Sequence, residues 1–230
     1  MHADFLTFLQ SHAGERGSAQ AAAFYTGADH THYDVAVPTL RAFVKAWADD
    51  HKTLTYAEWE SLLTHLYNGT SVEEKLLGGL MLAQYGKYRA QLPFDVFESW
   101  LGQLEGWQEV DGTCQSIFTA KEMAARWPEW ESFLRRLARD ANIHKRRASL
   151  VLLIKPLRGN DPRFLTLMLD QVTVLQSERD KLITKAISWV LREAVRQHGP
   201  TVQQYIEAHQ ATLPASVVRE VTRKLETGKK

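Results

Sequence analysis

The sequence predicts an all-α protein from two observations. Apolar residues recur at intervals of three and four along almost every segment, as on one face of a helix. No segment shows the alternating β-branched pattern that is typical of a strand. Capping signals and Gly or Pro breaks divide the chain into about a dozen helices with short loops. Because short loops join antiparallel neighbours, we expect an α-solenoid of HEAT-like antiparallel helix pairs with a concave face, forming a single domain over residues 1–230. A globular bundle is the alternative, since no clean sequence repeat is visible.

Caps and prolines divide the first half of the chain. Thr55-Tyr-Ala-Glu58 and Ser71-Val-Glu-Glu74 are capping boxes, in which a hydroxyl and a carboxylate satisfy backbone N–H groups at a helix start. Asn68-Gly69 suits a helix end, Pro38 suits the first turn of a helix, and Leu92-Pro93 opens another helix. We therefore expect helices around residues 5–9 and 21–25, a loop over 27–37, and helices from residues 38, 56, 72 and 93.

The second half is divided in the same way. Asp161-Pro162 reads as a cap followed by a first-turn proline, and Ser177-Glu-Arg-Asp180 resembles a capping box. Gly199-Pro200 is expected to break the helix that follows. We expect helices over 112–126, restarting at Pro128, over 143–155, capped by Asn142 and closed by Pro156, from residue 162, from residue 177 to about 198, and over 202–209 and 215–225.

Composition excludes several classes of protein. The chain is 44% hydrophobic and 24% charged, as in soluble globular proteins, and no apolar run approaches the roughly 18 residues of a membrane span. No secretory signal is visible, and the single cysteine, Cys114, cannot form an intrachain disulfide, so we expect a cytoplasmic protein.

The sequence also lacks motifs for a metal or a cofactor. His30-x-His32 has no third metal ligand at a suitable spacing, and there is no Walker loop or GxGxxG motif, so we expect no metal and no cofactor.

The net charge of +1 conceals a strong asymmetry between the two halves. Residues 1–120 carry 7 Lys and Arg against 15 Asp and Glu, or −8. Residues 121–230 carry 21 against 12, or +9. A basic half is typical of a polyanion-binding protein, whereas the alternative is that these side chains only solvate helix faces.

Three groups of residues could carry chemistry. Trp107 and Asp111 are four residues apart, so they share one face if a helix begins by Trp107. An aromatic face beside a carboxylate can hold a cationic ring and stabilise a developing positive charge. The alternative is a buried Trp near a helix start, with Asp111 as its N-terminal cap or first-turn acid.

The other two groups are basic. His144-Lys-Arg-Arg147 places cations near a helix start, where the helix dipole disfavours them, and Lys155 lies about two turns further on. This placement favours a phosphate partner, with a solvated basic face as the alternative. Lys185, Trp189 and Arg192 share a face opposite the apolar one, which suits stacking or contact with a nucleotide. The alternative is that Trp189 packs on a neighbouring helix.

In this order, these motifs resemble those of the AlkD-like DNA alkylation repair family, which consists of HEAT-like repeat DNA glycosylases. The matching motifs cover most of the chain: Tyr25; Val37-Pro38 with Arg41; Gly106-Trp107 with Asp111; Arg146-Arg147-Ala148 with Lys155; and Ala186-Ile-Ser-Trp189 through Arg192-Glu193.

The resemblance implies a monofunctional DNA glycosylase that removes 3-methyladenine and 7-methylguanine from duplex DNA. It implies that Trp107, Asp111 and Trp189 line the DNA-facing cleft beside the damaged nucleotide, and that Tyr25, Arg41, Arg146, Arg147, Lys155 and Arg192 contribute to DNA binding. The expected partner is double-stranded DNA containing alkylated bases. We expect the protein to be a monomer and to have no membrane partner. The alternative is a non-catalytic helical-repeat module that binds nucleic acid or protein, because related branches bind DNA without clear glycosylase activity.

Overall fold

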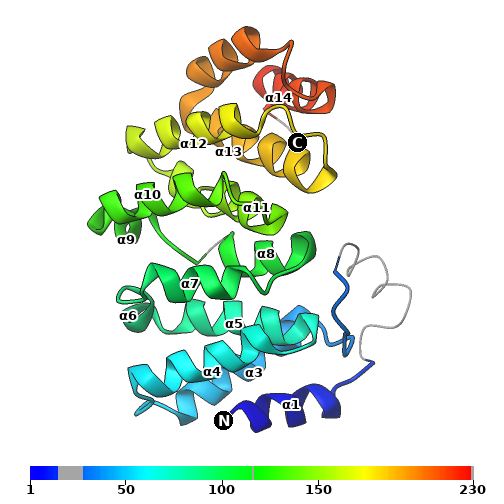
Figure 1. The fold of residues 1–230 in the computed structure, drawn as a ribbon, viewed down its shortest axis with the longest axis vertical. Coiled ribbons are helices and arrows are strands. Elements are labelled where there is room, and N and C mark those ends of the chain that lie inside the picture. Colours follow the sequence, from blue (N-terminus) through cyan, green and yellow to red (C-terminus); the bar gives the residue numbers. More distant parts are fainter. Residues whose placement is uncertain (15–27, 116, 229–230) are drawn as a thin grey trace. The chain divides into compact units, whose positions relative to one another are not determined.

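A computed structural model describes residues 1–14, 28–115 and 117–228. The chain divides into two compact units, unit 1 over Met1–Ile117 and unit 2 over Phe118–Lys230. The described residues form helices and no strand, apart from one isolated bridge between Thr31 and Ser71 (Figure 1). Consecutive helices pack together in pairs, such as α4 with α5 and α13 with α14, which confirms the predicted all-α solenoid class. That residues 1–230 form a single domain stays a prediction.

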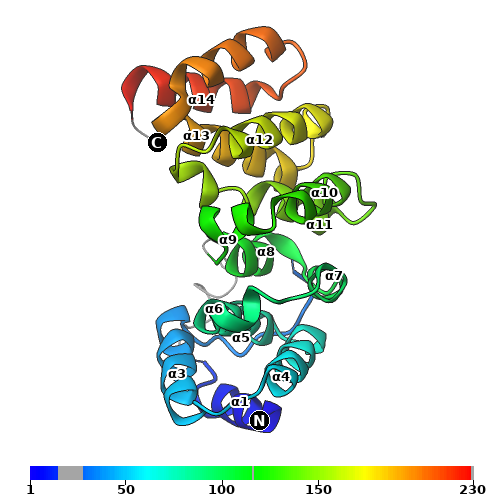
Figure 2. The same cartoon turned by 90° about the vertical axis from the view of Figure 1, so that its left-hand side faces the viewer.

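Unit 1 is built around α5. The helices described in unit 1 are α1 (His2–Ser11), α3 (Val37–Asp50), α4 (Tyr56–Asn68), α5 (Val72–Gln84), α6 (Gly86–Arg89), α7 (Phe94–Leu101) and α8 (Gly106–Cys114). Helix α5 packs against α3, α4 and α8 (Figure 2), and its residues Leu77, Met81 and Leu82 are completely buried. The expected second helix at residues 21–25 lies outside the described residues.

Both predicted capping boxes of unit 1 are confirmed. Thr55 accepts from the Glu58 backbone N–H at the start of α4, while the Glu58 carboxylate accepts from the Thr55 N–H. Ser71 and Glu74 do the same at the start of α5. Pro38 lies in the first turn of α3, as expected, because a helix leaves its first N–H groups without partners and a proline there removes nothing.

Two adjacent glycines let α5 approach its neighbours closely. A Cβ at Gly78 would lie 2.9 Å from the Tyr67 ring of α4. A Cβ at Gly79 would lie 2.6 Å from the carbonyl oxygen of Gly112 in α8. The absence of side chains at these two positions therefore allows close helix packing and brings α8 against the core helix of unit 1.

Unit 2 consists of the remaining helices. They are α9 (Ala120–Ala125), α10 (Trp127–Leu137), α11 (Ile143–Val151), the 3₁₀ helix η1 (Pro156–Arg158), α12 (Pro162–Leu175), α13 (Lys181–His209) and α14 (Ala215–Thr227). Helix α13 packs against α11, α12 and α14. Its apolar face, including Ile187, Val190, Leu191 and Ala194, is completely buried, as the sequence predicts.

Three predicted helix boundaries in the second half were wrong. The expected helix over 112–126 does not form, because α8 ends at Cys114 and Thr119 opens a new helix through a capping box with Glu122. Helix α11 ends at Val151 rather than residue 155. Ser177 does not open α13: Asp180 is its N-cap and accepts from the Leu182 N–H at 2.7 Å.

The remaining helix caps and the helix break predicted for unit 2 are confirmed. Asn142 caps α11 by accepting from the backbone N–H groups of His144 and Lys145, and Asp161 caps α12 ahead of Pro162. The expected break at Gly199-Pro200 is a kink at His198, whose φ of −132° is not helical, and the chain then continues in α13.

Candidate functional site

Helix α8 carries the candidate catalytic residues, and it begins at Gly106. Gly106 has a φ of +65°, a left-handed conformation that favours glycine, directly after the extended N-cap residue Glu105. No side chain caps this end in the usual way. Instead the Glu109 carboxylate reaches back one turn and accepts from the Glu105 backbone N–H at 2.7 Å. Asp111 therefore lies in the second turn of α8, and its predicted alternative role as N-terminal cap or first-turn acid is wrong.

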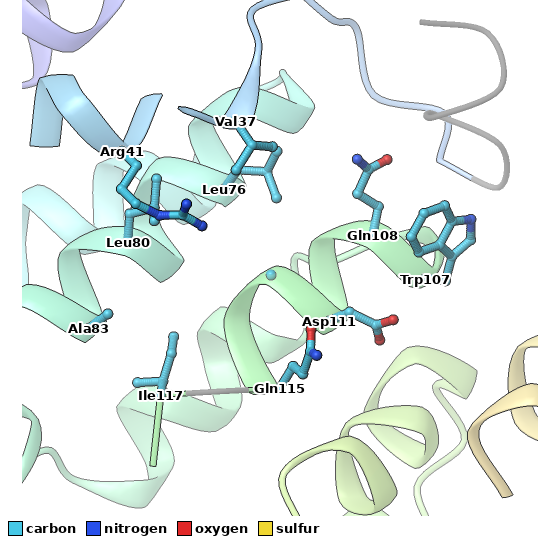
Figure 3. A pocket seen from close by; sticks show the side chains of 11 residues that line it. Val37, Arg41, Leu76, Leu80, Ala83, Trp107, Gln108, Asp111, Gln115 and Ile117 are labelled. Carbon is cyan, nitrogen blue, oxygen red and sulfur yellow. The ribbon is translucent and has the colours of Figure 1, made fainter. Parts of the chain in front are cut away.

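Trp107 and Asp111 project from the same side of α8 (Figure 3). Both side chains are partly exposed and line a cleft of about 430 Å³ within unit 1. Arg41 of α3 lines the same cleft, so the structure brings three of the predicted site residues together. The remaining lining residues are Val37, Leu76, Leu80, Ala83, Gln108, Gly112, Gln115 and Ile117.

The side of α8 that faces the protein is anchored by a buried carboxylate. Glu109 is completely buried and lies 2.9 Å from Nδ1 of His30. Burial raises the pKa of the Glu109 carboxyl, against the opposing effects of its bonds to Glu105 and His30 and of the nearby Lys75 charge. Glu105 in turn accepts from the Asp29 backbone N–H at 2.8 Å. The start of α8 is thus fixed to the segment that precedes α3.

The same segment, residues 28–36, also completes the start of α5. The Glu73 carboxylate is buried and accepts from the backbone N–H groups of Tyr33 at 3.0 Å and Val35 at 3.3 Å. The Val72 N–H, one of the helix-start donors that α5 cannot satisfy itself, donates to the Thr31 carbonyl at 2.9 Å. One irregular segment therefore ties the N-terminal ends of α5 and α8 into the same unit.

A buried lysine closes the end of α4 beside this network. The Lys75 ammonium donates to the carbonyl oxygens of Tyr67 and Gly69, which belong to the last turn of α4 and its C-cap. Burial lowers the pKa of Lys75, and the nearby carboxylates, Glu109 first, oppose the decrease. We did not expect these buried charges from the sequence, which predicts only the capping role of Glu74.

In unit 2, the predicted basic residues of α11 have defined partners. Arg146 forms an ion pair with Glu178 at 2.8 Å and donates to the carbonyl oxygens of Asp140 and Ala141. Arg147 is 3% exposed and donates to the Leu182 carbonyl of α13 at 2.5 Å. Lys155 is half-buried in the turn between α11 and η1. Phosphate contacts from these three residues stay predictions.

The face of α13 that carries Trp189 is bounded by an acidic side chain of α14. Trp189 is half-buried and lies along the helix between Lys185, which is exposed, and Arg192, which is half-buried. Arg192 donates to the backbone and side-chain oxygens of Ser188, both at 3.1 Å. Glu220 accepts from the Ser188 hydroxyl at 2.5 Å and lies 3.6 Å from Lys185 and 3.8 Å from Arg192. The Ser188 hydrogen bond, followed by the two cations, lowers the pKa of Glu220 despite partial burial.

Some residues singled out from the sequence have no place in the cleft. Tyr25 lies outside the described residues. His30 and His32 face Glu109 and Asp34, and the described part of the chain contains no group of three or more potential metal ligands. Cys114 is a buried cysteine that is not part of a disulfide. None of the described helices combines the length and apolar composition that crossing a bilayer requires.

Comparison with known proteins identifies the family. A model of the DNA alkylation repair enzyme family matches residues 6–225, nearly the whole chain. Among solved structures, the fold is similar to a chain described as a predicted DNA alkylation repair enzyme from Enterococcus faecalis, with a TM-score of 0.76 and 17% identity over 93% of this chain and 96% of that one. No curated protein matches. The chain therefore belongs to the DNA alkylation repair enzyme family.

Proposed function

We propose that this protein is a monofunctional DNA glycosylase that excises positively charged alkylpurines, 3-methyladenine and 7-methylguanine, from duplex DNA. The observation that carries the proposal is the placement of Trp107 and Asp111 on one side of α8, in a cleft that also contains Arg41. A carboxylate, an aromatic face and a guanidinium are the groups needed for a reaction at a cationic nucleotide within a phosphate backbone.

The chemistry of the substrate explains why so few groups suffice. Alkylation at N3 or N7 gives the purine a formal positive charge, so the bond from the sugar C1′ to N9 is already weakened. As this bond breaks, its electron pair neutralises the base and positive charge develops on the sugar. The Asp111 carboxylate stabilises that charge and orients the water that attacks C1′. The Trp107 ring favours a cationic base over a neutral one.

The net charges of the two units support different roles for them in this proposal. Residues 118–120 are uncharged, so unit 1 carries −8 and unit 2 carries +9. The net positive charge of unit 2 favours binding of the phosphate backbone, which supplies most of the sequence-independent affinity for DNA. In this proposal Trp189 is the second aromatic residue beside the lesion. In the same proposal the protein binds double-stranded DNA as a monomer, and the DNA-binding residues are Tyr25, Arg41, Arg146, Arg147, Lys155 and Arg192.

The experiment compares base release by the wild type and by Asp111→Asn. We expect the wild type to release 7-methylguanine from methylated duplex DNA, and Asp111→Asn to slow single-turnover release by about 10²–10³-fold, the usual effect of removing one preorganised electrostatic group. Its melting temperature should be unchanged, because Asp111 does not cap α8.

The matched control is Asp95→Asn, which removes an exposed carboxylate from the first turn of α7 without touching the cleft. It should release the base at the wild-type rate. Near-normal release by Asp111→Asn would remove the catalytic assignment. Binding of methylated duplex DNA without any release by the wild type would favour the alternative, a non-catalytic nucleic-acid-binding module.

A further inference from the structure

Helix α8 is held from behind by a contact with a distant part of the chain. Glu109 lies two positions after Trp107 and two before Asp111, or about 200° around the helix axis from each. Its carboxylate is completely buried: one oxygen accepts from the Glu105 backbone N–H at 2.7 Å, and the other lies 2.9 Å from Nδ1 of His30. Neither Glu109 nor His30 lines the cleft that Trp107 and Asp111 face (Figure 3).

The two ends of α8 are held by different parts of unit 1. Towards its C-terminal end, Gly112 packs closely on α5. The first turn has no side-chain cap, and the contact between Glu109 and His30 joins it to residues 28–36. A helix of nine residues that is closely packed near one end can turn about its axis unless the other end is fixed too. A rotation of about 10° would move a side-chain group that lies about 5–6 Å from the axis by about 1 Å.

We propose that Glu109 and His30 are positioning residues whose hydrogen bond fixes the rotation of α8. Through α8 this bond places the Asp111 carboxylate and the Trp107 ring for base release. The inference rests on the proposed function and adds to it two residues that act from the far side of the helix. A misplacement of about 1 Å can cost about 10²-fold in rate. The affinity for DNA should hardly change, because neither residue lines the cleft.

Two substitutions of similar length separate the hydrogen bonds from the space that the side chain fills. In Glu109→Gln the amide oxygen accepts from the Glu105 N–H, and the amide nitrogen donates to His30, whose neutral ring accepts at Nδ1 in one of its tautomers. Glu109→Met makes neither bond. We expect single-turnover release of 7-methylguanine near the wild-type rate in Glu109→Gln and about 10- to 100-fold slower release in Glu109→Met. The dissociation constant for duplex DNA should stay close to the wild-type value in both.

Substitutions of His30 test the other partner. His30→Asn keeps a donor near the position of Nδ1 and should retain activity, whereas His30→Ala should slow release as Glu109→Met does. If both residues act through one bond, the double variant His30→Ala/Glu109→Met is no slower than the slower single variant, because the second change removes an interaction already lost. Effects that multiply would refute action through one bond.

A core truncation in unit 2 controls for lost stability. Val172 is completely buried in α12, far along the chain from α8. Val172→Ala and Glu109→Met should each melt about 2–8 °C below the wild type, the first through a cavity and the second through unpaired buried groups. At a temperature where all variants are folded, Val172→Ala should release the base at the wild-type rate.

The position of α8 can also be followed without any reaction. In ¹⁵N-labelled protein, the indole N–H resonance of Trp107 is assigned by its absence from Trp107→Phe. It should shift in Glu109→Met and in His30→Ala, and return towards its wild-type place in Glu109→Gln. The resonance of Trp130, which is buried in α10 of unit 2, should stay in place in all three.

Two results would overturn the inference. One is release as slow in Glu109→Gln as in Glu109→Met, because activity would then not follow the hydrogen bonds. The other is a Trp107 resonance that no substitution of Glu109 or His30 moves. If Glu109→Met does not fold, His30→Ala and His30→Asn give the same comparison. A Trp107 resonance that follows the bonds in a protein that releases no base would retain the positioning contact and refute the proposed glycosylase.

Discussion

Substituting Gly79 with alanine tests whether the close approach of α5 to α8 holds the candidate site in position. A Cβ at residue 79 would lie 2.6 Å from the Gly112 carbonyl oxygen and 3.1 Å from its carbonyl carbon, and both atoms are backbone. Carbon–oxygen contacts in proteins lie at about 3.3–3.6 Å, so α8 must move away from α5 by about 0.7 Å. Because Asp111 directly precedes Gly112, the displacement reaches the proposed catalytic carboxylate.

The expected effect on stability is small and the effect on activity is larger. Overpacking costs about 1–3 kcal/mol, and alanine regains about 1 kcal/mol of helix propensity over glycine. The net loss of about 0–2 kcal/mol corresponds to a fall in melting temperature of up to about 6 °C. A misplacement on the order of 1 Å can cost about 10²-fold in rate, so we expect single-turnover release to fall by about 10- to 100-fold.

The adjacent glycine provides a matched control. Gly78→Ala introduces the same methyl group into the same helix, but against the Tyr67 ring of α4, at 2.9 Å, instead of against α8. Gly112→Ala approaches only the Leu76 side-chain methyl, which can rotate, and should leave stability unchanged or slightly raised. Release is measured at a temperature where all variants are folded. If Gly79→Ala releases 7-methylguanine as fast as Gly78→Ala, close packing on α5 does not position the site.

Three further predictions follow from charge. If four to six phosphates are neutralised, log K for duplex DNA should fall with log salt at a slope of about −4 to −5, and a flat dependence would contradict DNA binding through unit 2. Cation–π attraction to Trp107 and Trp189, worth about 0.5–2 kcal/mol, should favour 7-methylguanine over uracil in a competitive assay, and equal excision would refute it. Because the pKa of Glu220 is lowered from 4.5, its carboxylate stabilises the fold above that value and the contribution is lost as pH falls through the folded pKa. Glu220→Gln should therefore melt about 2–4 °C lower at pH 7 and converge with the wild type as pH falls through the folded pKa, whereas a difference that is constant with pH would exclude the carboxylate charge as its cause.

The sequence predicts helix starts well where a short pattern decides them. The boxes at Thr55 and Ser71 and the caps at Asn142 and Asp161 each require only a side chain and backbone N–H groups two or three residues away. Ser177 shows the limit of such patterns, since its spacing to Asp180 imitates a box while Asp180 alone caps the helix. The box formed by Thr119 and Glu122 starts a new helix at Ala120, which is why no single helix extends over residues 112–126.

The start of α8 could not be predicted locally. It depends on a left-handed Gly106 and on a carboxylate at position 109 that is held by His30, 79 residues away along the chain. Burial decides the protonation and partners of such a group, and burial depends on tertiary packing. Through the resemblance to family motifs, the sequence does single out Trp107, Asp111 and Arg41 as candidate site residues, and the structure places all three along one cleft. It gives no indication that Gln108 is buried in the same cleft with no hydrogen-bond partner for its amide among the described residues.

The ion pairs of unit 2 determine over what distance its positive charge attracts DNA. Arg146 is held by Glu178, and Arg192 lies close to Glu220, so these pairs contribute little net charge at close range. The net +9 of the unit acts instead at distances up to the Debye length of about 10 Å, where it attracts a polyanion and governs the rate of encounter. A phosphate that contacts Arg146 must then replace a carboxylate of similar charge. Arginine loses less side-chain entropy in that exchange, because its planar group is already oriented. The predicted contribution of these arginines is therefore to fix the register of the DNA backbone, while overall attraction comes from the charge of the whole unit.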